Sequence, residues 1–132
     1  PIVDISQFAQ TFCDVVNDIM NFNVVVLDKD NVIATNSKSK AYLGKFISVQ
    51  LEELLEERKS FLYNVSDGSK MLQLFVDDDN TYYSQIIVPI LANSDIVGGI
   101  VAFTNTPDSI NFNMSDVKTL QTVACFMARQ VE

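Results

Sequence analysis

Hydrophobic residues recur at steps of three and four near both ends of the chain, which is the period of an α-helix with a buried face. At the N-terminal end these residues follow Asp4, a possible helix cap, and they are Ile5, Phe8, Phe12, Val15, Val16 and Ile19. At the C-terminal end they follow Ser115, and they are Val117, Leu120, Ala124, Met127 and Val131. The second set has the spacing of a heptad seam, and further apolar residues lie off the seam. We therefore expect a terminal helix at each end, with more apolar surface than a single contact covers.

Between these helices, short β-branched runs bounded by turn residues predict strands. Residues 24–27 and 32–35 flank Asp30-Asn31 and predict a tight hairpin. Since the first run is apolar at every position, its strand should be covered on both faces. A strand is also expected at 61–65 and, with less support from the pattern, at 71–76.

The longest predicted hairpin joins 82–91 to 96–105 through a four-residue turn at 92–95. Pro89 lacks an amide hydrogen, so it should lie at a bulge or on an unpaired edge. Gly98 and Gly99 indicate a close approach, more readily by a covering helix than by a ligand. Residues 36–45 predict a loop with one or two helical turns, and 49–59 a helix with an acidic, solvated outer face.

This order of elements lacks the strand–helix alternation of parallel sheets, so we expect an α+β fold. Its antiparallel sheet of five or six strands would carry the two terminal helices on one face. The segment 36–59 would cover the other face and leave a ligand pocket there. Surplus apolar surface on the terminal helices predicts a two-fold dimer, or a higher oligomer, built on a four-helix bundle.

Composition narrows the function classes. The 132 residues are 48% hydrophobic, which suits a single domain over 1–132, and the net charge of −8 argues against binding DNA through bulk charge. With no histidine, a Ser-His-Asp triad and a His-ligated metal are excluded. Cys13 and Cys125 lack zinc or disulfide spacing and are expected to be reduced thiols in the cytoplasm. The run 77–79 of aspartates lacks the EF-hand pattern and is interpreted as a solvated turn. No catalytic residue, metal, cofactor or membrane contact is expected.

Candidate ligand-binding residues are polar groups at the hairpin ends and in the covering segment. They are Asn36, Ser37, Ser39, Tyr42, Lys45, Tyr63, Tyr83 and Gln85. Lys38, Lys40 and Lys45 make this loop the most basic stretch, which is compatible with an anionic ligand. The alternative for each residue is packing on the sheet or keeping the loop soluble.

Candidate dimer-interface residues are the apolar positions of the two terminal helices. They are Phe8, Phe12, Val16, Leu120, Ala124, Met127 and Val131. Arg129, in the last turn, complements the helix dipole and is also placed to pair with Asp14 or Asp18 of a second chain.

Several segments together resemble GAF domains, and more closely the GAF-type C-terminal domain family of the stage V sporulation protein T regulators. These segments are 6–9, 23–30, 42–48, 88–90 with 96–101, and 124–130, so the resemblance extends over the whole chain. It implies a regulatory domain of a cytoplasmic bacterial transcription factor that dimerises and senses an unidentified small molecule. DNA would be bound only by a basic N-terminal hairpin domain, which we expect to precede this chain because it begins at Pro1. Cys125 departs from the glycine common at its position.

Two other functions remain open at this point. One is a purely structural dimerisation module whose pocket is filled by its own side chains, with Phe46, Phe61 and Phe75 as plugs. The other is an enzyme, since some GAF domains reduce methionine sulfoxide with pocket cysteines. Cys13 and Cys125 both fall in the predicted terminal helices, away from the expected pocket, which argues against the enzyme.

Overall fold

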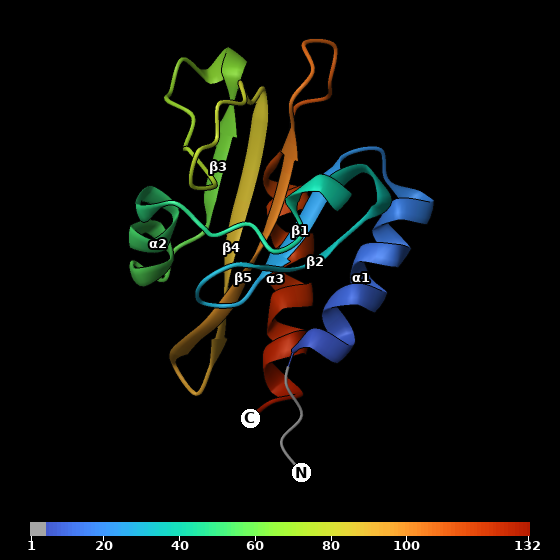
Figure 1. The fold of residues 1–132 in the computed structure, drawn as a ribbon, viewed down its shortest axis with the longest axis vertical. Helices are drawn as coiled ribbons and strands as arrows, with labels where there is room; N and C mark the ends of the chain where they lie inside the picture. The colour runs from blue at the N-terminus through green and yellow to red at the C-terminus, as the bar shows by residue number, and fades with distance from the viewer. Residues whose placement is uncertain (1–4) are drawn as a thin grey trace.

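The computed structural model describes residues 5–132, which form an antiparallel five-stranded sheet with helices on both faces (Figure 1). The strand order is β2-β1-β5-β4-β3. In chain order the elements are α1 (Ser6–Ile19), β1 (Asn23–Leu27), β2 (Val32–Thr35), η1 (Ser37–Tyr42), α2 (Val49–Glu56), β3 (Phe61–Asn64), η2 (Val65–Asp67), β4 (Ser84–Ala92), β5 (Asp95–Thr104) and α3 (Met114–Arg129). The predicted α+β class and the antiparallel sheet are confirmed.

The sheet separates two hydrophobic cores, because successive side chains of a strand point to opposite faces. In β5, Ile100 and Ala102 belong to the core under α1 and α3, whereas Val101 and Phe103 belong to the core under α2. Strand β1 lies between β2 and β5 and is buried at all five positions, so the predicted internal strand is confirmed. Helix α1 packs on β1 and β2, and α3 packs on β4 and β5.

The terminal helices differ from the prediction at their caps. The predicted cap Asp4 lies outside the described residues, and Ile5 at the start of α1 makes no side-chain cap. Helix α3 begins before Ser115, because Asn113 and Asp116 form a reciprocal capping box. The Asn113 side chain accepts from the Asp116 amide at 3.0 Å, and the Asp116 carboxylate accepts from the Asn113 amide at 2.8 Å.

One helix and one turn are shorter than predicted, and one predicted strand is absent. Helix α2 ends at Glu56 and not at residue 59, and Arg58 follows it with a φ of 60°. The β4–β5 turn has two residues and not four, since Ala92 pairs with Asp95 while Asn93 and Ser94 take positive φ values. Residues 71–76 are not a strand, and their one β-bridge joins Phe75 to Ile47.

Pro89 and the two glycines occupy special positions in the β4–β5 hairpin. Pro89 lies beside a register shift and beyond Ile87, the last β4 residue that pairs with β3, so its prediction is confirmed. A Cβ on Gly99 would lie 3.1 Å from the Leu55 side chain of α2, as expected for a covering helix. The expectation is wrong for Gly98, where a Cβ would lie 2.0 Å from the Leu27 backbone oxygen of the neighbouring strand.

Among residues 5–132, no helix has both the length and the apolar character needed to cross a bilayer.

We predict that Gly98→Ala destabilises the protein by at least about 3 kcal/mol, because the new methyl group meets backbone that must move. Gly99→Ala is the control in the adjacent residue and should cost less. Its new methyl group would lie 3.3 Å from the nearest backbone atom, the Val88 oxygen, and 3.1 Å from the Leu55 side chain, which can shift. Urea denaturation of both variants measures the two losses. Equal losses would contradict this account of the hairpin.

Candidate functional site

The face of the sheet under η1 is filled by a cluster of aromatic rings. Tyr42 stacks on Phe75 with ring centroids 5.1 Å apart, and it meets Phe103 edge to face at 5.3 Å. Tyr82 meets Phe103 from another side at 5.2 Å. Phe75, Tyr82 and Phe103 are buried, so this space is occupied by the protein's own side chains.

Of the three predicted plugs, only Phe75 belongs to this aromatic cluster. Phe46 is 65% exposed, and Phe61 is half-buried in β3. Tyr42 and Tyr82 fill the remaining volume. The sequence did not distinguish these residues from other aromatic residues of the chain.

Asp78 holds the loop that covers this cluster. Its carboxylate accepts hydrogen bonds from the Tyr82 hydroxyl, from the Leu74 amide at 3.2 Å and from Asn80 at 2.8 and 3.0 Å. Burial acts to raise the pKa of Asp78, but these hydrogen bonds outweigh it and hold the pKa below its ordinary value. The predicted solvated turn therefore describes the exposed Asp77 and Asp79 but is wrong for Asp78.

Side chains also explain why 71–76 does not pair as a strand. The buried Gln85 of β4 accepts from the Leu72 amide at 2.9 Å and donates to the Leu72 carbonyl at 2.7 Å. Gln50 accepts from the Gln73 amide at 3.0 Å. Because side chains already satisfy these backbone groups, the segment does not need a neighbouring strand.

Most of the eight predicted ligand residues have structural partners or lie apart. Asn36 accepts from the Val24 amide at 3.3 Å and donates to the Phe22 carbonyl at 2.8 Å. Ser39 donates to the Asn23 side chain at 3.0 Å. Of the others, Tyr63 and Gln85 are buried, Tyr42 and Tyr83 are half-buried, and Ser37 and Lys45 are exposed. Their role in binding a ligand stays a prediction.

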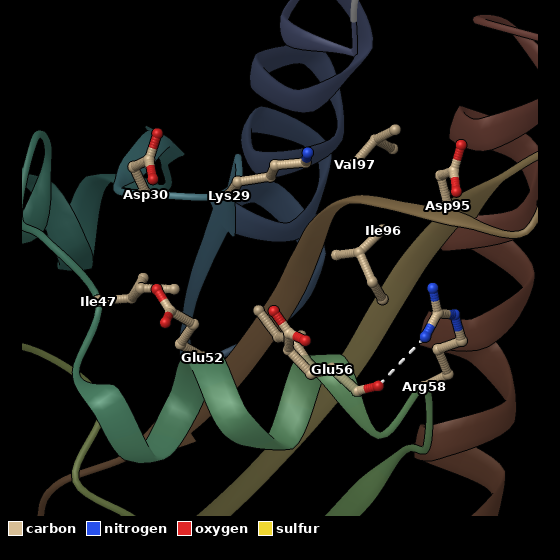
Figure 2. A pocket seen from close by; sticks show the side chains of 10 residues that line it. Lys29, Asp30, Ile47, Glu52, Glu56, Arg58, Asp95, Ile96 and Val97 are labelled. Atoms are coloured by element: carbon tan, nitrogen blue, oxygen red, sulfur yellow. Dashed lines mark hydrogen bonds between the residues drawn. The ribbon is translucent and has the colours of Figure 1, made fainter.

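A cavity of about 570 Å³ lies at the other end of the α2 face, and none of those eight residues lines it (Figure 2). We call it the charged cavity. It lies between the β1–β2 turn, α2 with the residues after it, and the start of β5. Its lining residues are Lys29, Asp30, Ile47, Glu52, Leu55, Glu56, Arg58, Asp95, Ile96 and Val97. Four carboxylates and two cations thus surround an apolar floor.

Arg58 links the charged cavity to the β4–β5 turn. Its Nε donates to the Ser94 carbonyl at 3.1 Å, and its Nη1 donates to the Glu56 carbonyl at 3.3 Å, which Figure 2 shows as a dashed line. In the same turn, the Asn93 amide donates to the carboxylate of Glu132 at 3.1 Å. Glu132 lies 3.8 Å from Arg129 in α3, so polar contacts run from the cavity to the end of that helix.

The sequence did not reveal the charged cavity, because its lining comes from three separated segments. Glu52 and Glu56 were interpreted as a solvated helix face, and both are indeed exposed. Their spacing of four residues places them on one side of α2, which was the available signal. Among the described residues, no group of three or more acidic or cysteine side chains is arranged to hold a metal ion.

The opposite face carries an apolar groove of about 260 Å³ between α1 and α3. Of the seven predicted interface residues, Val16, Leu120, Ala124 and Met127 are buried against the sheet of their own chain. The other three, Phe8, Phe12 and Val131, are half-buried. The large apolar residues that these helices leave exposed are Val15, Ile19, Met20, Met114 and Phe126.

The heptad spacing thus identified the buried face of α3 but not its partner, which is the sheet. Arg129 contacts Glu132 of its own chain. Phe126 meets Phe8 edge to face, with ring centroids 6.1 Å apart.

The two cysteines lie in the terminal helices, as the positions of those helices predicted. Cys13 lies on the buried face of α1, and burial raises the pKa of its thiol to about 12. Cys125 is exposed on α3.

Comparisons with known proteins agree with this architecture. The family model described as "Stage V sporulation protein T C-terminal, transcription factor" matches residues 4–132. Stage V sporulation protein T of Bacillus subtilis (strain 168) is 34% identical over 135 residues, which covers 100% of this chain and 71% of that protein.

Among solved structures, the GAF domain of an Acinetobacter phosphoenolpyruvate-protein phosphotransferase superposes with a TM-score of 0.72. It is 15% identical, and the match covers 98% of this chain and 82% of that one. A type II free methionine-R-sulfoxide reductase from Thermoplasma acidophilum has a TM-score of 0.65 at 17% identity, covering 97% of this chain and 95% of that one. At such identities, these likenesses show the GAF fold alone.

We predict that Asp78→Asn lowers the free energy of unfolding by about 1–2 kcal/mol at pH 7, because the hydrogen bonds to an ionised carboxylate are lost. The folded pKa of Asp78 lies below its unfolded value of about 3.9, so its contribution is complete above that value. It disappears as the pH falls through the folded pKa. The ionised carboxylate of Asp78 therefore stabilises the protein at pH 7, and this stabilisation is lost in strong acid.

Chemical denaturation of both proteins at pH 7, 5 and 3 measures this difference. Asp79→Asn, at an exposed neighbour, is the control and should change stability little at any of these values. A difference between wild type and Asp78→Asn that stays constant from pH 7 to pH 3 would contradict the prediction.

Proposed function

Since the chain belongs to the stage V sporulation protein T C-terminal family of transcription factors, we propose that it dimerises and senses a small molecule, and so controls DNA binding by a separate N-terminal domain. The match covers 71% of the Bacillus subtilis relative, which leaves a segment of that protein for a further domain. We place the regulator in the cytoplasm, without a membrane partner.

The net charge of the chain supports the assignment of DNA binding to a separate domain. Contacts to DNA phosphates need clustered lysine and arginine side chains, and here 17 acidic residues outnumber nine basic ones. The net charge of −8 makes the overall electrostatic interaction of this domain with DNA unfavourable. DNA contact is therefore assigned to the N-terminal domain.

The proposed dimer is supported by the apolar surface that remains exposed on the terminal helices after the chain has folded. On α1, Ile19 is 70% exposed and Val15 49%, and Met20, directly after the helix, is 46% exposed. They border the apolar groove, whose lining also includes Phe12 and Val123. A second copy related by two-fold symmetry would cover the groove with its own α1 and α3 and complete a four-helix bundle.

Small-molecule sensing is supported by the charged cavity. Its volume of about 570 Å³ falls within the range of ligand sites, and it combines an apolar floor with six charged side chains. The hydrogen bonds of Arg58 and Asn93 connect it to the end of α3. Ligand control of a dimer requires unequal affinity for two arrangements of its helices, and this connection supplies a physical route.

A second candidate function is a structural dimerisation module without a ligand. The stacked pair Tyr42 and Phe75 favours it, because these rings fill the space under η1 where the sequence predicted a pocket. The dimer is common to both candidates, and ligand binding separates them.

We propose no enzymatic activity. The reductase of similar fold raises the question, but the thiol of Cys13, with a pKa of about 12, is almost entirely protonated at neutral pH. Cys125 is exposed on α3 and lines a neighbouring pocket with Arg58, outside the charged cavity. Neither thiol is among the residues that line the charged cavity.

We predict that Ile19→Asp weakens the dimer at least tenfold without unfolding the chain, because it puts a charge into an apolar contact. Val49→Asp is the matched control, since Val49 is also 70% exposed but lies on α2, across the sheet. Sedimentation equilibrium measures the dissociation constants, and circular dichroism checks the fold. A wild-type chain that stays monomeric at 100 μM (about a hundredfold above a typical micromolar interface) would refute the dimer, and so would equal effects of the two variants.

A further inference from the structure

We propose that the charged cavity binds a small zwitterion whose ammonium and carboxylate groups are separated by an aliphatic segment. This inference rests on the proposed small-molecule sensing and names the chemical class of the ligand. It is drawn from the charges of the cavity, from its floor and from the hydrogen bonds of Arg58.

Both signs of charge in the cavity are available to a ligand. Lys29 and Arg58 share it with the carboxylates of Asp30, Glu52, Glu56 and Asp95. No ion pair within 4 Å joins any of these six side chains; over residues 5–132 the one pair found is Arg129 with Glu132. A purely anionic ligand would face four carboxylates and a purely cationic one two cations, whereas a zwitterion can pair with both.

The apolar floor separates the charges. Leu55 and Ile47 are buried, and Ile96 and Val97 are half-buried. In Figure 2 the side chain of Ile96 lies between the carboxylates of α2 on one side and Lys29 on the other. A ligand that reaches both sides has to cross this aliphatic surface, which methylene groups do at a gain of about 0.8 kcal/mol for each one fully buried.

The two ends of the ligand have different partners. Glu52 and Glu56 are one helical turn apart on the same side of α2 and suit an ammonium group. Arg58 uses two of its five N–H groups, on the carbonyls of Ser94 and Glu56, and keeps three for a carboxylate. In Figure 2, Lys29 lies apart from Arg58, on the other side of the cavity, so the carboxylate end is assigned to Arg58 alone.

Because Arg58 also binds the β4–β5 turn, a ligand in the cavity would affect contacts outside the cavity. A ligand carboxylate bound to the free N–H groups of Arg58 would share its guanidinium group with the Ser94 carbonyl. Ser94 belongs to the two-residue turn whose Asn93 amide binds Glu132 after α3. Binding would thus act on the C-terminal end of α3, a helix whose first half lines the apolar groove.

Ligands with one stem and different charges test the proposal. The probes are 6-aminohexanoate, hexanoate and hexylamine, titrated into the ¹⁵N-labelled chain and followed by amide chemical shifts. We expect 6-aminohexanoate to move the amides of 28–31, 52–58 and 94–98 in a saturable way, and to bind at least tenfold more tightly than either single-charge analogue. Glycine, with both charges on one carbon, should bind as weakly as they do.

Three outcomes would overturn the proposed binding of a zwitterion. Equal affinities for hexylamine and 6-aminohexanoate would show that the cavity selects cations alone, and shifts outside the three segments would place the ligand elsewhere. An absence of saturable shifts with 6-aminohexanoate up to 10 mM (about ten times a weak, millimolar Kd) would equally reject it.

Substitutions test which cavity residues bind the ammonium group and which bind the carboxylate of the ligand. Arg58→Asn removes the cation while asparagine still tolerates the positive φ, and it should reduce 6-aminohexanoate binding at least tenfold but leave hexylamine binding unchanged. Glu52→Gln should weaken both amines, whereas Glu53→Gln, one position along α2 and outside the cavity lining, should weaken neither. Equal effects of Glu52→Gln and Glu53→Gln would contradict the assignment of the ammonium end.

Sedimentation with and without 6-aminohexanoate separates this inference from the proposed function. Saturable binding with an unchanged dimer constant would leave the site standing and reject its coupling to the dimer. A dimer that forms normally in a chain that binds none of the probes would reject the site and leave the dimer standing.

Discussion

Two adjacent strands that are buried on both faces determine how the rest of the chain is used. All of β1 and the second half of β5 are inaccessible to water, and their alternate side chains enter two different cores. Each face then needs a cover of its own. Helices α1 and α3 supply one, while α2, η1 and the loop 71–82 supply the other. The apolar seam of α3 is therefore buried within the chain. The surfaces that remain accessible to other molecules include a narrower apolar strip on the outside of the helices and the charged cavity.

The sequence was informative wherever local periodicity and burial coincide. The run of four apolar residues after Asn23 predicted an internal strand, and Pro89 predicted an interruption of pairing, because each depends on backbone chemistry within a few residues. The sequence did not predict, in this way, which element each helix face packs against. Leu120 and Met127 have the same spacing whether they pack on a sheet or on a second helix. The charged cavity was missed for a related reason, since its parts become neighbours only after the sheet has formed.

The loop 71–82 shows how side chains can replace regular structure. Gln85, Gln50 and Asp78 bind its backbone amides at positions where a strand would have used a neighbour. This leaves the loop free to place Phe75 and Tyr82 over the sheet, and the aromatic cluster they form with Tyr42 and Phe103 closes that region. In this chain the large side chains of the loop fill the space under η1, and the charged cavity lies at the other end of the α2 face.

The mismatch in length between β3 and β4 has a consequence for self-association. Strand β3 pairs with β4 only as far as Ile87, so one side of Val88–Ala92 has no strand beside it in the described part of the chain. Such an open edge is normally a template on which a further strand can add. Pro89 sits within it and offers no amide hydrogen. The fold thereby discourages growth of the sheet from one molecule into the next, and molecules that meet are left to recognise one another by side chains.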